Sequence, residues 1–166
     1  MNDVIVEIKD LYFSYNSTSV LENVNLAVYK NDFLMIVGPN GGGKTTLLKL
    51  IIGLLKPKKG VVKVFNKNPC EALPKIGYVP QKVNAKLDFP LRVIDAVLMG
   101  ISKPFFSFGY SKTDIEKACN ILESVEMLDF KDKKMNELSG GQIQRVYLAR
   151  ALISDPTLLK IGIAHV

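Results

Sequence analysis

Apolar and polar positions alternate over the first thirty residues. Residues 4–8 and 11–15 are rich in β-branched and aromatic side chains, residues 16–19 are polar, and residues 20–29 form a second run of the first kind. Alternation with this composition predicts half-buried strands, and a polar turn between two such runs predicts a hairpin. We therefore expect an antiparallel sheet in the N-terminal part of the chain.

The pattern changes at residues 33–37, which read Phe-Leu-Met-Ile-Val. A continuous apolar run of this length predicts a strand buried on both faces, as in a parallel sheet. A glycine-rich turn follows directly, and residues 44–52 then have the composition of a helix that ends at Gly53. This strand–turn–helix order indicates an α/β fold.

Helical spacing dominates the second half of the chain. Short strands are expected at residues 61–65 and 76–79, and apolar residues from Leu91 onward then predict a helix that ends at Gly100. Ser111-Lys112-Thr113-Asp114 has the Ser-x-x-Asp form of a capping box at the start of another helix. A further helix is expected after the glycine pair at residues 140–141.

These elements predict one domain with an insertion. Residues 1–81 should contain the antiparallel sheet and the core around the glycine-rich turn. Residues 82–140 should form an inserted helical section, and residues 141–166 should add the last helix and a final strand.

Composition supports a soluble globular chain. Its 166 residues are 48% hydrophobic, which is too apolar for disorder. No apolar run reaches the ~18 residues of a membrane span, and the N-terminus lacks a signal-peptide pattern. The net charge of +6 fits either a solvated basic face or a site for a polyanion. Cys70 and Cys119, without a CxxC motif, indicate neither a disulfide framework nor a zinc site.

The glycine-rich turn carries the first chemical motif. Residues 38–45, Gly-Pro-Asn-Gly-Gly-Gly-Lys-Thr, fit the pattern G-x-x-x-x-G-K-[ST]. Glycines let successive backbone N–H groups point at one anion, and the helix that follows adds its positive N-terminal end. In this pattern Lys44 neutralises phosphate oxygens and the Thr45 hydroxyl can bind Mg²⁺. The motif predicts a nucleotide phosphate site.

A second motif, Leu138-Ser139-Gly140-Gly141-Gln142, follows the first at a distance along the chain. The two motifs in this order resemble the ATP-binding cassette (ABC) family, whose ATPase subunits drive membrane transporters. The resemblance implies a P-loop NTPase core with a mostly parallel sheet, an N-terminal antiparallel β subdomain and an inserted α-helical subdomain. It covers nearly the whole chain.

The resemblance also assigns roles to individual residues. It implies ATP and Mg²⁺ as cofactors, with Gln81 of the Tyr78-Val79-Pro80-Gln81 loop contacting Mg²⁺ and the attacking water. Leu138 to Gln142 would face the γ-phosphate bound by a second subunit in a head-to-tail dimer. The implied nucleotide contacts are Tyr15 (as the adenine-stacking aromatic), Gly38, Pro39, Asn40, Gly41, Gly42, Gly43, Lys44, Thr45 and Thr46.

Each of these residues has a plainer alternative. Tyr15 could be an ordinary strand aromatic, and Gln81 a surface amide. Arg145 and Arg150 could reach phosphates, but pairing on the helix surface is at least as frequent for such residues. An aromatic cluster is expected to serve the core or a subunit contact rather than base stacking; it comprises Phe105, Phe106, Phe108 and Tyr110.

The chain departs from the family after Leu159. The family's next strand should end in Asp-Glu, whereas Gly162 and Ile163 stand at those positions. Lys160 enters a strand that should be buried, which is unfavourable without a partner, and His165 is expected to be a tail residue. We therefore expect the C-terminal part of the family fold to be missing, through truncation, a frameshift or a deliberate nucleotide-binding fragment.

Residues 77–81, 88–90 and 97–100 look similar to those of zinc and manganese importers. The implied function is the ATP-binding subunit of a transporter for a divalent metal ion, peripheral on the cytoplasmic face of the membrane. Its partners would be permease subunits, a second ATP-binding subunit and, indirectly, a solute-binding protein, with no nucleic acid. The alternatives are a catalytically dead nucleotide binder and a soluble ABC ATPase without a transport role.

Overall fold

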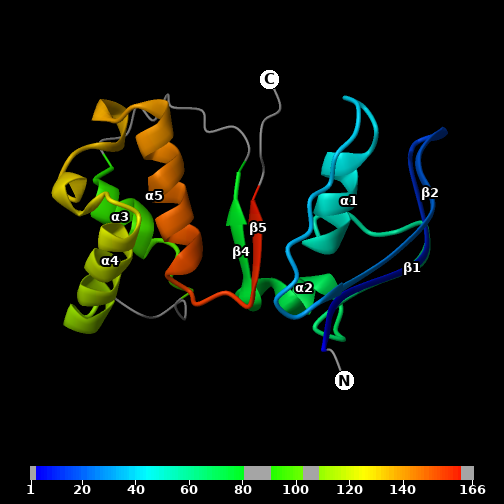
Figure 1. Ribbon diagram of the computed structural model, residues 1–166, viewed down its shortest axis with the longest axis horizontal. Helices are drawn as coiled ribbons and strands as arrows, with labels where there is room; N and C mark the ends of the chain where they lie inside the picture. Colours follow the sequence, from blue (N-terminus) through cyan, green and yellow to red (C-terminus); the bar gives the residue numbers. More distant parts are fainter. Residues whose placement is uncertain (1–2, 81–90, 103–108, 162–166) are drawn as a thin grey trace. The chain divides into compact units, whose positions relative to one another are not determined.

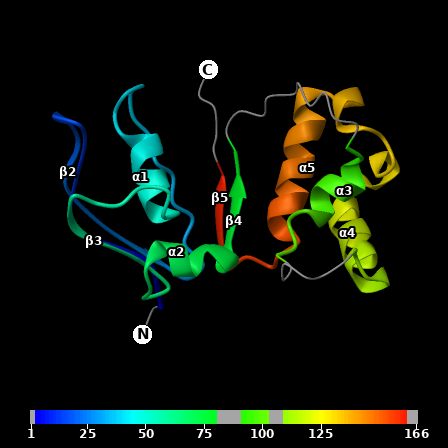
Figure 2. The ribbon, with the colours of Figure 1, turned by 180° about the vertical axis from the view of Figure 1, so that it is seen from behind.

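The computed structural model describes residues 3–80, 91–102 and 109–161. The chain divides into two compact units, residues 1–73 and residues 74–166. Figures 1 and 2 show the elements of each unit from opposite sides.

A three-stranded antiparallel sheet is the principal element of the N-terminal unit. Its strands are β1 (Val4–Tyr15), β2 (Thr18–Tyr29) and β3 (Lys59–Val64), in the order β2-β1-β3. Ile8 of β1 lies between Leu26 of β2 and Val62 of β3. The predicted hairpin is confirmed, and β3, labelled in Figure 2, pairs with the other edge of β1.

Two helices complete this unit. They are α1 (Lys44–Ile51) and α2 (Pro69–Ala72). Leu50 of α1 is fully buried, as is Val64 of β3, so one helix face and one sheet face share a core. Gly53, with φ 75°, follows α1 where the sequence predicts the helix to end.

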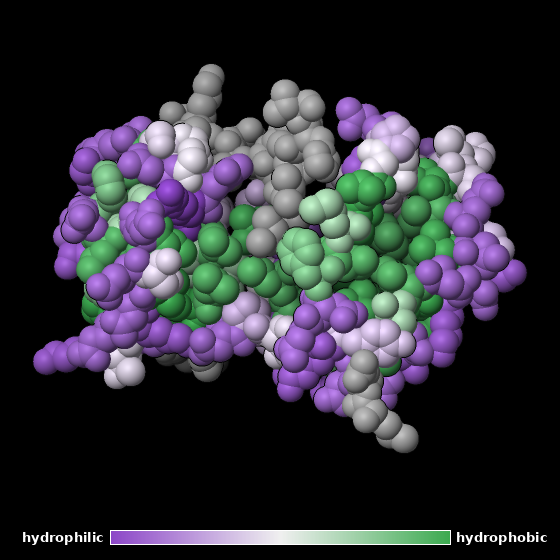
Figure 3. All heavy atoms as spheres, in the orientation of Figure 1, coloured by the Kyte–Doolittle hydropathy of each residue, from purple (hydrophilic) through white to green (hydrophobic). Residues whose placement is uncertain are grey.

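The segment 33–37 contradicts its prediction. It has no regular secondary structure, and Phe33 and Val37 are 85% and 66% exposed. A strand needs a neighbour to pair its backbone N–H and C=O groups, and none of the described strands pairs with this segment. Apolar composition alone therefore did not make it a buried strand. Exposed hydrophobic residues appear as green areas on the face drawn in Figure 3.

The C-terminal unit contains a short parallel sheet. It pairs β4 (Ile76–Val79) with β5 (Leu158–Ile161). The Thr157 N–H donates to the Lys75 carbonyl at 3.0 Å, which fixes the entry to β5 beside β4. With the antiparallel sheet of the other unit, this parallel pair confirms the expected mixed α/β class.

Lys160 finds an aromatic partner inside this sheet. It lies opposite Tyr78 in the register, and its Nζ is 4.1 Å from the centre of the Tyr78 ring. Burial lowers the pKa of the Lys160 ammonium. The cation–π contact offsets part of the cost of placing a lysine in a strand.

Helices surround the core of this unit. They are α3 (Val93–Leu98), α4 (Lys112–Ser124) and α5 (Gly140–Leu152), whose buried side chains form one cluster. The predicted capping box is present, because Ser111 and Asp114 exchange hydrogen bonds at the start of α4. Short 3-10 helices are Leu73–Lys75, Leu128–Phe130 and Met135–Glu137.

α5 belongs to the same core as α3 and α4, since Val146 and Ala149 are buried with Val97 and Leu122. The predicted boundaries at residues 81 and 140 stay predictions. No helix among the described residues is long and apolar enough to cross a membrane.

Candidate nucleotide-binding site

Residues 38–43 form the loop that the sequence predicts to bind phosphate (the phosphate-binding loop), and its last glycines fix its path. Gly41 and Gly43 have φ angles of 84° and 78°, a region that glycine adopts without strain. A Cβ atom on Gly43 would lie 2.8 Å from Leu21 Cδ2 and 3.0 Å from the Val20 carbonyl oxygen. Gly43 therefore packs directly against β2, and this contact determines where the loop ends.

The loop leads directly into α1. Gly43 is the N-cap of this helix and has no side chain to cap it. The first N–H groups of a helix lack an intrahelical partner, and the helix dipole adds partial positive charge there. The Gly42 N–H donates to the Pro39 carbonyl at 3.1 Å and closes the turn. The backbone alone therefore offers donors and positive charge to an anion.

Lys44 adds a cation to the loop. Its Nζ donates to the carbonyl oxygens of Gly38 and Pro39 at 2.6 Å and 2.7 Å. The side chain is folded back over the loop, so the ammonium group lies beside the turn that would hold a phosphate. A phosphate oxygen is a stronger, charged acceptor that would compete with these two carbonyls.

The two threonines of α1 differ in environment. Thr45 is exposed, whereas Thr46 is 7% exposed and packs in the core. The Thr45 hydroxyl is therefore available to an oxygen-coordinated cation such as Mg²⁺, and Thr46 can offer an anion only its backbone N–H. No cluster of three or more His, Cys, Asp or Glu side chains occurs in the described parts of the chain. Mg²⁺ here would depend on Thr45 and on nucleotide phosphates.

Tyr15 is the last residue of β1, at the hairpin turn that leads into β2. The residue is 46% exposed, and its ring meets the ring of buried Phe13 edge-to-face, with centroids 5.0 Å apart. Phe13 pairs with Leu21 in the register, and Leu21 is the residue that packs against Gly43. An exposed aromatic surface and the phosphate-binding loop therefore belong to one connected part of the N-terminal unit.

The second motif opens α5. The Ser139 hydroxyl accepts from the Gln142 N–H at 3.3 Å, and the Gln142 Oε1 accepts from the Ser139 N–H at 2.9 Å. Sequence reasoning missed this capping box, although Ser-x-x-Gln is a recognisable signal. Leu138 is buried, and Cβ atoms on Gly140 and Gly141 would meet nothing within 4 Å.

A pocket of about 340 Å³ lies beside this motif. It is lined by Ser139, Gly141 and Gln142, and across from them by Glu126, Met127 and Phe130. Arg145 also lines it, and its Nη1 donates to Glu126 Oε2 at 2.5 Å. Arg150 lies 6.0 Å from the ring centre of Tyr147. Arg145 therefore pairs with a residue that follows α4, and Arg150 with a ring of its own helix; whether either reaches a phosphate stays a prediction.

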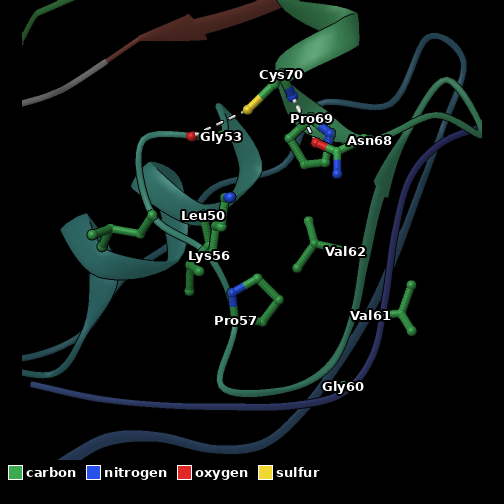
Figure 4. A pocket seen from close by; sticks show the side chains of 11 residues that line it. Leu50, Gly53, Lys56, Pro57, Gly60, Val61, Val62, Asn68, Pro69 and Cys70 are labelled. Atoms are coloured by element: carbon green, nitrogen blue, oxygen red, sulfur yellow. Dashed lines mark hydrogen bonds between the residues drawn. The ribbon is translucent and has the colours of Figure 1, made fainter.

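The N-terminal unit has a separate pocket of about 200 Å³ between α1, α2 and β3 (Figure 4). Leu50, Pro57 and Val62 make it largely apolar, and the Cys70 thiol donates to the Gly53 carbonyl at 3.5 Å. This pocket does not include the phosphate-binding loop.

Several predicted residues lie outside the described residues. They are Gln81, the aromatic residues Phe105, Phe106 and Phe108, and the C-terminal Gly162, Ile163 and His165. Tyr110 of the aromatic cluster is described and is 38% exposed.

Two contacts escape sequence reasoning altogether. The packing of Leu21 on Gly43 joins residues far apart in the chain. The Lys58 Nζ donates to the Asn16 carbonyl, next to Tyr15. Neither contact has a local sequence signal, because both depend on how the strands are paired.

Comparison with known proteins gives one consistent family. The ABC transporter family profile matches residues 21–161. The zinc uptake system ATP-binding protein ZurA of Listeria monocytogenes is 41% identical over 162 residues, covering 93% of this chain and 62% of the relative. The zinc transport system ATP-binding protein TroB of Treponema pallidum is also 41% identical, covering 92% of this chain and 58% of the relative.

A solved nucleotide-free ATP-binding cassette from an ABC transporter has the same fold. It superimposes with a TM-score of 0.80 at 30% identity, covering 97% of this chain and 71% of that structure. The chain spans about three fifths of the length of the curated relatives ZurA and TroB.

Proposed function

The chain belongs to the ABC transporter family, and from this premise we propose that it binds ATP through residues 38–46, with Tyr15 against the adenine. The observation that carries the proposal is the geometry at Gly43, whose left-handed φ and contact with Leu21 turn the loop into the start of α1. That turn aims backbone N–H groups and the helix dipole at one point.

Lys44 supplies the positive charge for the phosphates. Its present contacts with the loop carbonyls support this role, because they keep the ammonium group at the turn before any ligand arrives. Mg²⁺, when bound with ATP, would neutralise charge between the β- and γ-phosphate oxygens. Thr45, in the first turn of α1, is exposed, and its hydroxyl could hold the Mg²⁺ ion. By family resemblance we assign Gln81 to the same coordination shell of Mg²⁺.

We propose that the motif from Leu138 to Gln142 meets the γ-phosphate held by a second subunit. The glycines support this proposal. Glycine in the interior of a helix costs about 0.5–1 kcal/mol relative to alanine. Gly140 and Gly141 have no positive φ and no close neighbour in the described structure that would exclude a side chain. Glycine at these two positions is explained if the backbone of another subunit or a ligand approaches the start of α5 closely.

The transport role rests on the relatives. ZurA and TroB are named for zinc uptake and transport. We propose by analogy that this chain serves import of a divalent metal ion, zinc or manganese, as an ATP-binding subunit. It would act on the cytoplasmic face with permease subunits, a second ATP-binding subunit and, indirectly, a solute-binding protein. Residues 1–81, 82–140 and 141–166 are our proposed divisions of the domain.

A second candidate is a nucleotide binder without turnover. Gly162 and Ile163 stand where the family has the Asp that holds Mg²⁺ and the Glu that polarises water. Loss of such general-base and positioning groups costs about 10²–10⁴-fold in rate. On this proposal ATP binding survives where hydrolysis does not.

Paired assays on the 166-residue chain separate the two candidates. ATP binding is titrated by calorimetry, and phosphate release is followed with Mg²⁺ present, in the parent and in Lys44→Ala. Binding that Lys44→Ala weakens, without phosphate release, supports the binder. Phosphate release that Lys44→Ala also abolishes supports an active ATPase. Equal ATP affinity in parent and variant refutes the site.

A further inference from the structure

The hairpin turn that follows Tyr15 is hydrogen-bonded to Lys58, which lies in a loop far along the sequence. The Lys58 Nζ donates to the carbonyl oxygen of Asn16 at 2.9 Å, across 42 positions in the sequence. The Lys58 backbone N–H donates to the Tyr12 carbonyl at 3.2 Å. Lys58 is therefore hydrogen-bonded to the hairpin at Tyr12, before Tyr15, and at Asn16, after it.

The loop that carries Lys58 has little freedom to leave the sheet. Gly60 has φ 88°, and a Cβ atom there would overlap the carbonyl oxygen of Asp10 on β1. The Lys59 Nζ lies 5.1 Å from the ring centre of Tyr12. Because residues 59 and 60 are held against β1, the backbone of Lys58 is fixed beside the hairpin.

The turn that follows Tyr15 is short. Tyr15 pairs with Thr18, so only Asn16 and Ser17 connect the two strands. Asn16 has φ 51°, in the left-handed region that asparagine adopts more readily than most other non-glycine residues. A charge-assisted hydrogen bond to the Asn16 carbonyl favours this conformation over others. Phe13 holds the Tyr15 ring from within the sheet.

We infer that Lys58 is a positioning residue for Tyr15, and through it for the base of the bound nucleotide. The inference rests on the proposed function, in which Tyr15 stacks on adenine. Lys58 holds the backbone next to Tyr15, and Phe13 supports its ring, so the exposed ring face is presented in one orientation. The phosphates, held by residues 38–46, do not depend on this contact.

The test compares a ligand with a base and a ligand without one. Binding of ATP and of inorganic tripolyphosphate to the full chain is measured by calorimetry for the parent, Lys58→Met and Lys58→Arg. We expect Lys58→Met to weaken ATP binding about three- to tenfold, the size of one hydrogen bond. Tripolyphosphate binding should be unchanged, and Lys58→Arg should recover most of the loss.

Lys56→Met is the matched control. Lys56 lies in the same loop, is exposed, and within the described residues has no hydrogen bond to the hairpin turn. Its removal changes the charge equally and should affect neither ligand. In a Tyr15→Ala background, Lys58→Met should have no further effect on ATP binding. Lys58 acts only through the stacking of Tyr15 on adenine, which this background already lacks.

Three results would overturn the inference: equal weakening of both ligands by Lys58→Met, no weakening of either, or an undiminished Lys58→Met effect in Tyr15→Ala. The first would mean that Lys58 acts on phosphate by charge alone. Failure of the proposed function gives a different result, since tripolyphosphate would then bind equally to the parent and Lys44→Ala. Each variant is compared between two ligands, so a general loss of stability does not imitate the expected pattern.

Discussion

Replacement of Gly43 by alanine tests the geometry of the phosphate-binding loop most sharply. The change adds one methyl group at a residue with φ 78°. An L-residue in this region costs about 1–2 kcal/mol. The new Cβ would also lie 2.8 Å from Leu21 Cδ2 and 3.0 Å from the Val20 carbonyl oxygen. Leu21 can rotate away, but the Val20 carbonyl belongs to β2 and cannot move without disturbing the sheet.

Overpacking of this kind costs about 1–3 kcal/mol. The expected loss for Gly43→Ala is therefore about 2–5 kcal/mol of unfolding free energy, a large part of the 5–15 kcal/mol typical of a domain. Gly41→Ala is the matched control, because Gly41 has φ 84° but open space around its Cβ position. It should lose only the backbone part, about 1–2 kcal/mol.

Urea unfolding of the parent and both variants measures these losses. If Gly43→Ala has an unfolding free energy no lower than that of Gly41→Ala, the packing of β2 on the loop does not contribute to stability. The structural explanation for the position of the loop would then be wrong.

Further predictions concern the other unit and the exposed segment. Ser139→Ala removes half of the capping box of α5 and should lower the unfolding free energy by about 1 kcal/mol, measured by urea unfolding; no loss would mean that the cap is not formed. Met35→Lys should increase the monomeric fraction in sedimentation velocity, because residues 33–37 expose apolar side chains; Leu54→Lys, at a single exposed leucine, is the control, and an equal effect would contradict a role for the segment. Burial lowers the pKa of Lys160 below the ordinary 10.5, so the unfolded chain binds more protons and stability should rise with pH through that lowered pKa; a parent and a Lys160→Met variant with parallel stability curves between pH 7 and pH 10 would refute this.

Local signals account for the parts of the fold that were predicted correctly. The hairpin of β1 and β2 follows from alternation around a polar turn, and the start of α4 follows from Ser111 and Asp114, which satisfy each other's N–H groups. The motif at residues 38–45 was recognisable because its residues are adjacent in the chain, and its binding of phosphate stays a prediction.

The features that were missed depend on tertiary pairing. Residues 33–37 have the composition of a buried strand, but pairing requires neighbours that composition does not supply. The partner of Lys160 became apparent only when parallel pairing placed Tyr78 opposite it. The bond between Lys58 and Asn16 likewise depends on the order β2-β1-β3.

ATP affinity of the parent and of Lys44→Ala tests the central claim most directly. Lys44 is the cation already bonded to the loop through Gly38 and Pro39. Loss of a charge-assisted hydrogen bond of about 1.5–3 kcal/mol corresponds to a roughly 10- to 150-fold weaker affinity. Calorimetric titration should show binding to the parent and a loss of this size in the variant, with both proteins unfolding at similar urea concentrations. Equal affinity in folded parent and folded variant would contradict nucleotide binding at this loop.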